Sequence, residues 1–303
     1  MRALWPILLI ATFLRAQEGW SPVPQVQPLP PASDQDEEWV CPMDKDIRSK
    51  TPGVCPRCGM KLVRGIAEAI EYPVRITTTP HRLAAGQDVQ LDFRIADPKT
   101  GKTVRNFEIV HDKLFHLFIV SQDGTVFMHE HPVQMPDGTF RFRTRFPKPA
   151  AYRVLCDFYP ASGTPQLISS TLIVPGEGFK LSMPELEPAL EPQKSANLTA
   201  ELVTEPQQPI AGALTLLFFK LTPDDGIEPY LSAWGHMMAA SWDLIDMIHT
   251  HPLYVTDPDN GAYKQVQFNL IFPRAGVYRV WVQFQRKGVV NTVAFNVPVS
   301  ELK

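Results

Sequence analysis

The sequence has no excess of either charge, and it has no long hydrophobic run beyond its first residues. Its 29 Lys and Arg residues nearly balance 32 Asp and Glu residues, which leaves a formal net charge of −3 over 303 positions. A face that binds nucleic acid or a membrane surface needs clustered positive charge, and the sequence contains no such cluster. Charges and prolines also interrupt every later apolar run before the ~18 residues of a transmembrane helix. We therefore expect no nucleic-acid partner and no membrane span in the mature chain.

Cysteine is scarce, with four in the chain, and the N-terminus indicates the compartment in which they are used. Arg2 precedes an apolar run from Leu4 to Leu14, which is too short for a membrane span but typical of a signal peptide. We expect residues 1–16 to be a signal peptide and the protein to be periplasmic or secreted. Four cysteines in an exported protein ordinarily form two disulfides. Their spacing here favours a different use.

Composition divides the rest of the chain into five further segments. Residues 17–37 are rich in proline and then in acid, as in a solvated tether, and residues 38–64 contain three of the cysteines. Residues 66–175 and 198–303 consist of short β-branched and aromatic runs between Gly, Pro and Asp turns, with a Pro- and Glu-rich linker at 176–197. The predicted fold is mostly β: a small knuckle followed by two tandem antiparallel β-sandwiches of immunoglobulin-like or cupredoxin-like type.

The two β-regions resemble one another in sequence. Three histidines in the first recur in the second at a constant spacing of 120 positions: His116, His129 and His131 match His236, His249 and His251. Phe146-Pro147 recurs as Phe272-Pro273 with six residues more between the copies, which places an insertion near 257–262. Such self-similarity predicts two copies of one unit with the same strand order.

Residues 38–64 combine thiols and thioethers in the sequence Cys41-Pro42-Met43, a gap, and then Cys55-Pro56-Arg57-Cys58-Gly59-Met60. Two residues between thiolates allow one turn to aim both sulfurs at a single point, and Gly59 permits the positive φ of that turn. Thiolate and thioether are soft ligands that favour Cu(I), while thiolates also suit Zn²⁺. The candidate ligands are Cys41, Met43, Cys55, Cys58 and Met60, with copper first and zinc second.

This stretch resembles the heavy-metal-binding domain found near the N-terminus of copper-efflux membrane-fusion proteins and of some copper-transporting P-type ATPases. That pattern runs Cys-Pro-Met-His-Pro, a gap, and Cys-Pro-Lys-Cys-Gly-Met-Lys-Leu. The positions that agree are Cys41, Pro42, Met43, Cys55, Pro56, Cys58, Gly59, Met60 and Leu62. The resemblance implies that Cys41, Cys55 and Cys58 are ligands. This chain has Asp44-Lys45 in place of His-Pro, which removes an imidazole and leaves the fourth ligand open.

A disulfide at Cys55–Cys58, or one that includes Cys41, is the alternative in an oxidising compartment. It accounts for the cysteines but not for Met43 and Met60. A segment of this size also has too little core to fold without a metal or a disulfide. Metal binding is the interpretation that covers all five sulfur-bearing side chains.

The repeated histidines are a second set of candidate ligands. Asp123-Gly124 is a hairpin signal, and a two-residue turn there places His116 opposite His131, with His129 on the same face. Asp243-Leu244 gives the same register for His236, His249 and His251 without the glycine. Three imidazoles on one face suit Cu(II) or Zn²⁺. The alternative is a structural role beside Phe118 and Val120, and His81, His111 and Cys156 are expected to be ordinary surface or core residues.

The sequence favours a binding protein over an enzyme. His129-Glu130-His131 lacks the continuation typical of metallo-hydrolases, no nucleophile elbow is present, and Cys156 is not repeated as a blue-copper ligand set would require. We therefore expect a non-catalytic protein that sequesters, delivers or confers resistance to metal ions. The alternative is an adaptor or metal-sensing component of an efflux assembly, in which a metal-efflux transporter is the partner.

Overall fold

The protein was analysed as a computed structural model that describes residues 39–40, 47–56, 59, 61–64, 70–161, 163–181, 185–252, 254–255 and 265–302. The predicted signal peptide, the tether at 17–37 and the predicted insertion near 257–262 lie outside the described residues. The chain divides into two compact units, Met1–Ala67 and Glu68–Lys303. Within the described ranges, no helix is long and apolar enough to cross a membrane.

The smaller unit contains three two-residue strands: β1 (Trp39–Val40), β2 (Arg48–Ser49) and β3 (Val63–Arg64). They pair antiparallel in the order β2-β1-β3. Cys55 and Leu62 are buried, and Trp39 and Ile47 pack against them. Among the described residues of this unit the core is small, and a segment of this size ordinarily needs a further source of stability.

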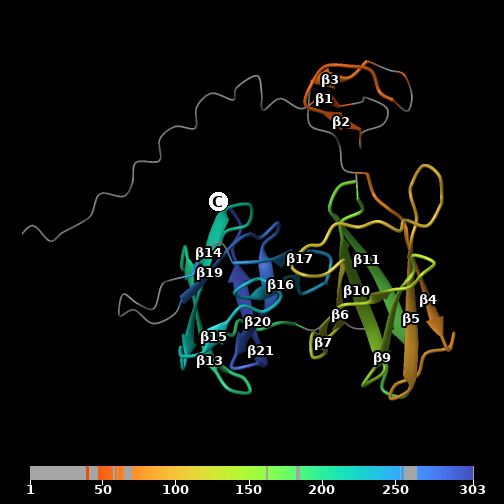
Figure 1. Cartoon of the computed structure of the whole chain (residues 1–303). Helices are drawn as coiled ribbons and strands as arrows, with labels where there is room; N and C mark the ends of the chain where they lie inside the picture. The colour runs from red at the N-terminus through yellow and green to blue at the C-terminus, as the bar shows by residue number, and fades with distance from the viewer. Residues whose placement is uncertain are drawn as a thin grey trace, which may run out of the picture. The chain divides into compact units, whose positions relative to one another are not determined.

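The larger unit begins with a β-sandwich whose strands lie between residues 74 and 174 (Figure 1). One sheet has the order β4-β5-β9-β8, and the other has the order β11-β10-β6-β7. The bounds are β4 (Val74–Thr79), β5 (Asp88–Ile95), β6 (Phe115–Ser121), β7 (Phe127–Glu130), β8 (Val133–Gln134), β9 (Phe140–Arg145), β10 (Ala150–Phe158) and β11 (Gln166–Val174). Alternate residues of these strands fill the space between the sheets, including Phe93, Phe115 and Phe140.

A second sandwich follows, with its strands between residues 193 and 299. Its sheets have the orders β12-β13-β14-β19-β18 and β15-β20-β16-β17, with β21 also paired to β20. The bounds are β12 (Gln193–Lys194), β13 (Thr199–Glu205), β14 (Leu214–Thr222), β15 (Ile227–Glu228), β16 (His236–Ser241), β17 (Met247–Thr250), β18 (Tyr254–Val255), β19 (Gln265–Ile271), β20 (Gly276–Arg286) and β21 (Val289–Val299). Strand β12 lies inside the segment predicted as a linker.

The two sandwiches share one strand order. The sheet β4-β5-β9-β8 corresponds to β13-β14-β19-β18, and β11-β10-β6-β7 corresponds to β21-β20-β16-β17. The mostly β fold of tandem antiparallel sandwiches is therefore confirmed. The described histidine segments lie on strands or directly after them, as the alternating pattern predicts.

Strands β6 and β16 are buried on both faces, which an isolated sandwich does not require. One face of each strand points into its own sandwich, and the other face contributes to a third apolar cluster formed by residues of both sandwiches. Its buried members are Phe118, Val120, Leu155, Met238, Ala240, Leu244, Met247 and Trp281. The sheets that carry the two histidine hairpins therefore pack against each other.

The contacts across this interface are reciprocal. Ser232 Oγ donates to Asp112 Oδ2 at 2.7 Å, and these two residues occupy equivalent positions in the repeated sequence. His129 of the first sandwich contacts Gln283 of the second, while the equivalent His249 contacts Asp157, which is the counterpart of Gln283. Equivalent surfaces thus meet as in a two-fold dimer, although both belong to one chain.

Candidate metal centre

The knuckle is described only in part. Cys55 is 2% exposed, whereas Cys41, Met43, Cys58 and Met60 lie outside the described residues, so their convergence stays a prediction. The expected turn is present after Cys55: the Gly59 N–H donates to the Cys55 carbonyl at 2.9 Å, and Gly59 has a φ of 76°. The positive φ of Gly59 and its bond to the Cys55 carbonyl are those that a Cys-x-x-Cys-Gly knuckle needs.

The histidine hairpins have the predicted register. In the first, Phe118 pairs with His129 and Leu117 with Glu130, so His116, His129 and His131 share a face. The turn is longer than the predicted two residues: the Ser121 N–H donates to the Val126 carbonyl at 3.0 Å and the Gly124 N–H donates to the Ser121 carbonyl at 2.7 Å, so residues 122–125 form the loop. The register is as predicted because this longer loop is centred on the same two residues. In the second hairpin, Met238 pairs with His249 in the same way.

The turn residues explain how both hairpins keep this register. Gly124 has a φ of 66°, and Leu244 takes the same left-handed conformation with a φ of 53°. Leu244 is 7% exposed and belongs to the apolar cluster between the sandwiches. Its burial offsets the strain of a branched side chain at positive φ, which accounts for the absence of a glycine.

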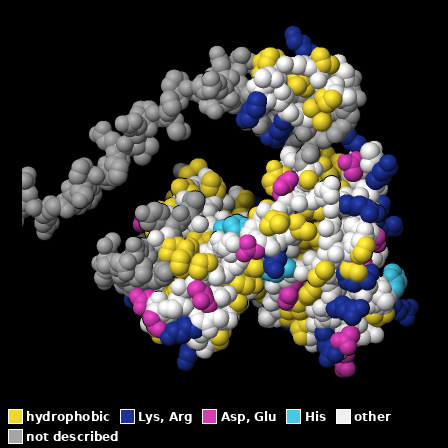
Figure 2. Space-filling view, viewed as in Figure 1, with side chains coloured by type: hydrophobic (Ala, Val, Ile, Leu, Met, Phe, Trp, Pro, Cys, Tyr) yellow, Lys and Arg dark blue, Asp and Glu magenta, His cyan; other side chains and the backbone are white. Residues whose placement is uncertain are grey.

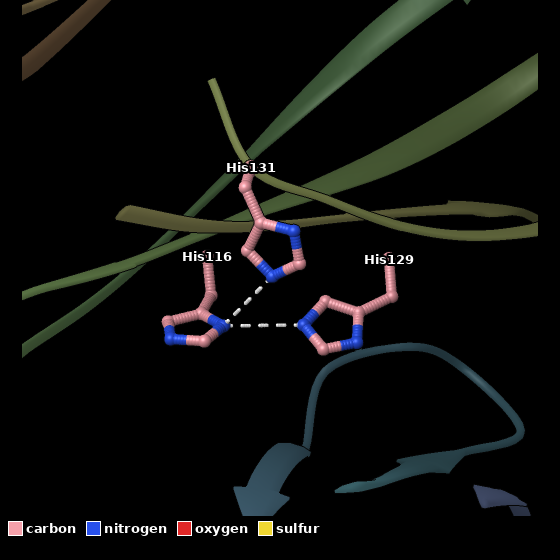
Figure 3. Close-up of side chains that lie close together, drawn as sticks. All are labelled: His116, His129 and His131. Atoms are coloured by element: carbon pink, nitrogen blue, oxygen red, sulfur yellow. Dashed lines mark hydrogen bonds between the residues drawn. The ribbon is translucent and has the colours of Figure 1, made fainter. Parts of the chain in front are cut away.

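The three histidines of the first hairpin converge (Figure 3). His116 Nδ1 lies 3.2 Å from His129 Nε2 and 3.2 Å from His131 Nε2. Ligand nitrogens at about 2.1 Å from a tetrahedral ion are about 3.4 Å from one another. The spacing of these nitrogens is therefore close to that of a metal-bound set.

The outer partners of His116 and His129 define which ring nitrogens carry hydrogen. Nε2 of His116 lies 2.9 Å from the Val110 carbonyl, which can only accept, so this nitrogen is the N–H. Nδ1 of His129 donates to Gln283 Oε1 at 2.7 Å, and the Gln283 amide nitrogen donates in turn to Thr292. The two nitrogens that face each other, His116 Nδ1 and His129 Nε2, then carry no hydrogen, and each points a lone pair at the other. A cation between them converts a repulsive contact into two bonds.

The second trio has a related but different geometry. His236 Nε2 donates to the Tyr230 carbonyl at 2.8 Å, and His236 Nδ1 lies 3.0 Å from His251 Nε2. His249 Nδ1 donates to Asp157 Oδ2 at 2.5 Å, with its side chain 3% exposed. The nitrogens within 4.8 Å of one another here belong to His129, His236 and His249, so one of them comes from the first sandwich. The two trios are thus not equivalent in arrangement, and metal binding at either stays a prediction.

Burial keeps these imidazoles neutral. Loss of water lowers the pKa of His129 to about 2, of His131 to about 3, of His236 to about 4 and of His251 to about 2. It also lowers the pKa of His116 and of His249. Figure 2 shows histidine colour in only small patches on the face in view. Neutral imidazole is the form that binds metal ions, so these histidines would need to lose no proton in order to bind one.

The sequence did not point to three residues of this region. His111, expected to be an ordinary residue, stacks on His251 with ring centroids 3.6 Å apart, at a backbone φ of 46°. Asp157 and Gln283 each hold the outer nitrogen of a histidine from the other sandwich. Burial raises the pKa of Asp157 to about 6. The available signal was that Asp157 and Gln283 occupy equivalent positions, each three residues after a repeated segment, Tyr152-Arg153-Val154 and Tyr278-Arg279-Val280. Cys156 is buried in the first core, as expected of a small hydrophobe, and burial raises its pKa.

Each of the two units contains residues that match a known protein family. Residues 68–176 and 186–301, together more than half of the chain, match a family described as a domain of unknown function, DUF8832. The chain belongs to this family. Residues 38–64 of this DUF8832 protein match the heavy metal binding domain, which confirms that part of the resemblance. Comparison with curated proteins gave no significant match.

Solved structures similar to the DUF8832 protein include two bacterial adhesins. The adhesin FdeC of Escherichia coli is 15% identical over 79% of this chain and 69% of that one, with a TM-score of 0.25. The adhesin InvE of Yersinia pseudotuberculosis is 9% identical over 75% of this chain and 60% of that one, with a TM-score of 0.23. Scores of this size carry no argument about function.

Proposed function

We propose that this DUF8832 protein is an exported binder of heavy-metal ions, copper first and zinc second, that sequesters the ions or hands them on without catalysis. The match of residues 38–64 to the heavy metal binding domain carries the proposal. The three cysteines and two methionines of that segment supply soft ligands, which favour Cu(I) over harder ions. The apolar run at Leu4–Leu14 supports export to a periplasmic or extracellular location.

The histidines of the larger unit supply a second, harder class of ligand. Their nitrogens converge, they are neutral because they are buried, and imidazole suits Cu(II) and Zn²⁺. A protein with both ligand classes can hold copper in either oxidation state. Such a capacity suits sequestration, delivery or resistance.

The knuckle is tested by the double substitution of Cys55→Ser and Cys58→Ser in the reduced full chain. We expect the number of tightly bound Cu(I) ions to fall by one per chain, because two of three thiolates are lost. The measurement is a titration against a competing Cu(I) chelator. Cys156→Ala is the matched control, since this thiol is buried in the first sandwich and should leave the stoichiometry unchanged. Unchanged Cu(I) affinity and stoichiometry in the double variant would refute a metal-binding knuckle.

A second candidate function is that of an adaptor or metal sensor in an efflux assembly. The division of the chain into two units favours it, because a separate knuckle can load metal while the sandwiches bind a partner such as a transporter. The two functions differ in one observable. A sensor changes its affinity for a partner protein when Cu(I) binds to the knuckle, whereas a storage or delivery protein transfers the ion itself.

A further inference from the structure

One group of ring nitrogens lies between the sandwiches and belongs to neither of the trios that the sequence defines. The nitrogens of His129, His236 and His249 lie within 4.8 Å of one another. His129 lies on β7 of the first sandwich, and His236 and His249 lie on β16 and β17 of the second. A set of this kind exists only when the two sandwiches are packed together.

Each of these histidines presents a lone pair to the others. His129 and His236 carry their hydrogen on the nitrogens that face Gln283 and the Tyr230 carbonyl, which leaves His129 Nε2 and His236 Nδ1 bare. His249 carries its hydrogen on Nδ1, toward Asp157. Its Nε2 is buried and has no hydrogen-bond partner among the described residues. A buried nitrogen without a partner is costly, and bonding to an ion removes that cost.

The outer nitrogens have the partners that metal-bound histidines require. A histidine ligand almost always donates its other N–H to a carboxylate, a carbonyl or a similar acceptor, which holds the ring in orientation. Here the acceptors are a carboxylate for His249, a side-chain amide oxygen for His129 and a backbone carbonyl for His236. Two of these acceptors come from the sandwich opposite to the ligand that they orient.

We propose that His129, His236 and His249 hold one zinc or copper ion between the sandwiches, so that the ion cross-links them. This inference rests on the proposed function and extends it to a site shared by both sandwiches. Binding draws the nitrogens from within 4.8 Å to about 3.4 Å of one another, a movement that side-chain rotation supplies. His251 Nε2, at 3.0 Å from His236 Nδ1, is placed to complete a fourth position.

The shared site also excludes a second ion at the first trio. His129 Nε2 has one lone pair and ligates one ion at a time, so the inter-sandwich set competes with the set of His116, His129 and His131. The histidine region therefore binds one ion through His129. His131 belongs to the first trio alone, and it provides the matched control.

The test uses the full chain with Cys41→Ser, Cys55→Ser and Cys58→Ser, which removes the knuckle thiolates. Zinc is titrated against a chromophoric chelator, and the fold of each variant is checked by far-UV circular dichroism. In this background His129→Gln, His236→Gln and His249→Gln should each weaken zinc binding by about 100-fold or more, because each removes a ligand. His131→Gln should weaken it by less than about 5-fold, because His131 is not a ligand of the shared site.

Asp157→Asn provides a second variant that keeps all three imidazoles. It should weaken zinc binding about 10-fold, because it removes the charge that orients His249. Asp157 also lies opposite His116 across β10 and β6, so His131→Gln remains the variant that separates the shared site from the first trio. Loss of zinc with His131→Gln, together with unchanged affinity in His236→Gln and His249→Gln, would place the ion in the first sandwich. That result would overturn this inference and leave the proposed function standing. Absence of any zinc binding in the thiolate-free chain would overturn it as well, while Cu(I) binding by the intact chain tests the knuckle separately.

Discussion

Acidification should destabilise the metal-free protein steeply below about pH 6.5. His129 and His236 have folded pKa values of about 2 and about 4, below the ordinary value of 6.5. At pH values above the folded pKa and below about 6.5, the unfolded chain binds protons at these histidines that the folded chain does not. The free energy of unfolding therefore falls as the pH falls. From about pH 7 to about pH 5 each of the two histidines removes about 2 kcal/mol.

Asp157 acts in the opposite direction over the same range. Burial raises its folded pKa to about 6, so the folded state takes up a proton before the unfolded state does, which returns about 1 kcal/mol by about pH 5. The three groups together leave a loss of about 3 kcal/mol. This is a large part of the stability of an ordinary domain.

Urea unfolding at the two pH values, with a strong chelator present, measures this loss. His129→Phe should flatten the dependence on pH, because the ring that resists protonation is absent while an apolar ring of similar size remains. His81→Gln is the control, since His81 is exposed and is not one of the buried histidines described above. A free energy of unfolding that stays constant between the two pH values would contradict the expected role of burial.

Truncation of Trp281 should be the most destabilising single change at the interface between the sandwiches. Trp281 is 3% exposed, and its ring stacks on Phe127 of the other sandwich with centroids 5.0 Å apart and planes at 10°. The Arg279 guanidinium lies 5.6 Å from the same ring. Replacing a buried tryptophan by alanine removes its apolar contacts and leaves a cavity, at a cost of about 3 to 5 kcal/mol.

The matched control is Trp242→Ala, because Trp242 is 42% exposed and lies outside the apolar cluster that joins the sandwiches. Its loss should cost less than about 1 kcal/mol. Thermal and urea unfolding of both variants give the comparison. If the sandwich interface contributes to the inter-sandwich metal site, Trp281→Ala should also weaken zinc binding. Equal stability of the two variants would show that the interface contributes little.

The strand register of the histidine hairpins, and the face on which their histidines lie, could be predicted from the sequence. Asp123-Gly124 predicts a two-residue turn, and the two-residue period of a strand then places His116, His129 and His131 on one face. The second hairpin follows the same register because Leu244 adopts the left-handed conformation. The two sandwiches follow from the alternation of apolar residues, and the repeated histidines indicate their correspondence. Each of these features depends on residues close together in the chain.

Only the tertiary structure decided what the histidine-bearing face of each hairpin contacts. His129 and Gln283 are 154 positions apart, and His249 and Asp157 are 92 positions apart, so no local pattern relates them. Strand periodicity shows which side chains share a face, but it does not show whether the face meets solvent, a ligand or another sheet. Packing of the apolar cluster around Phe118 and Met238 brings the two faces together and buries their histidines. That burial keeps the imidazoles neutral, and it joins nitrogens from both sandwiches into one set, because desolvation and contact depend on distance in space.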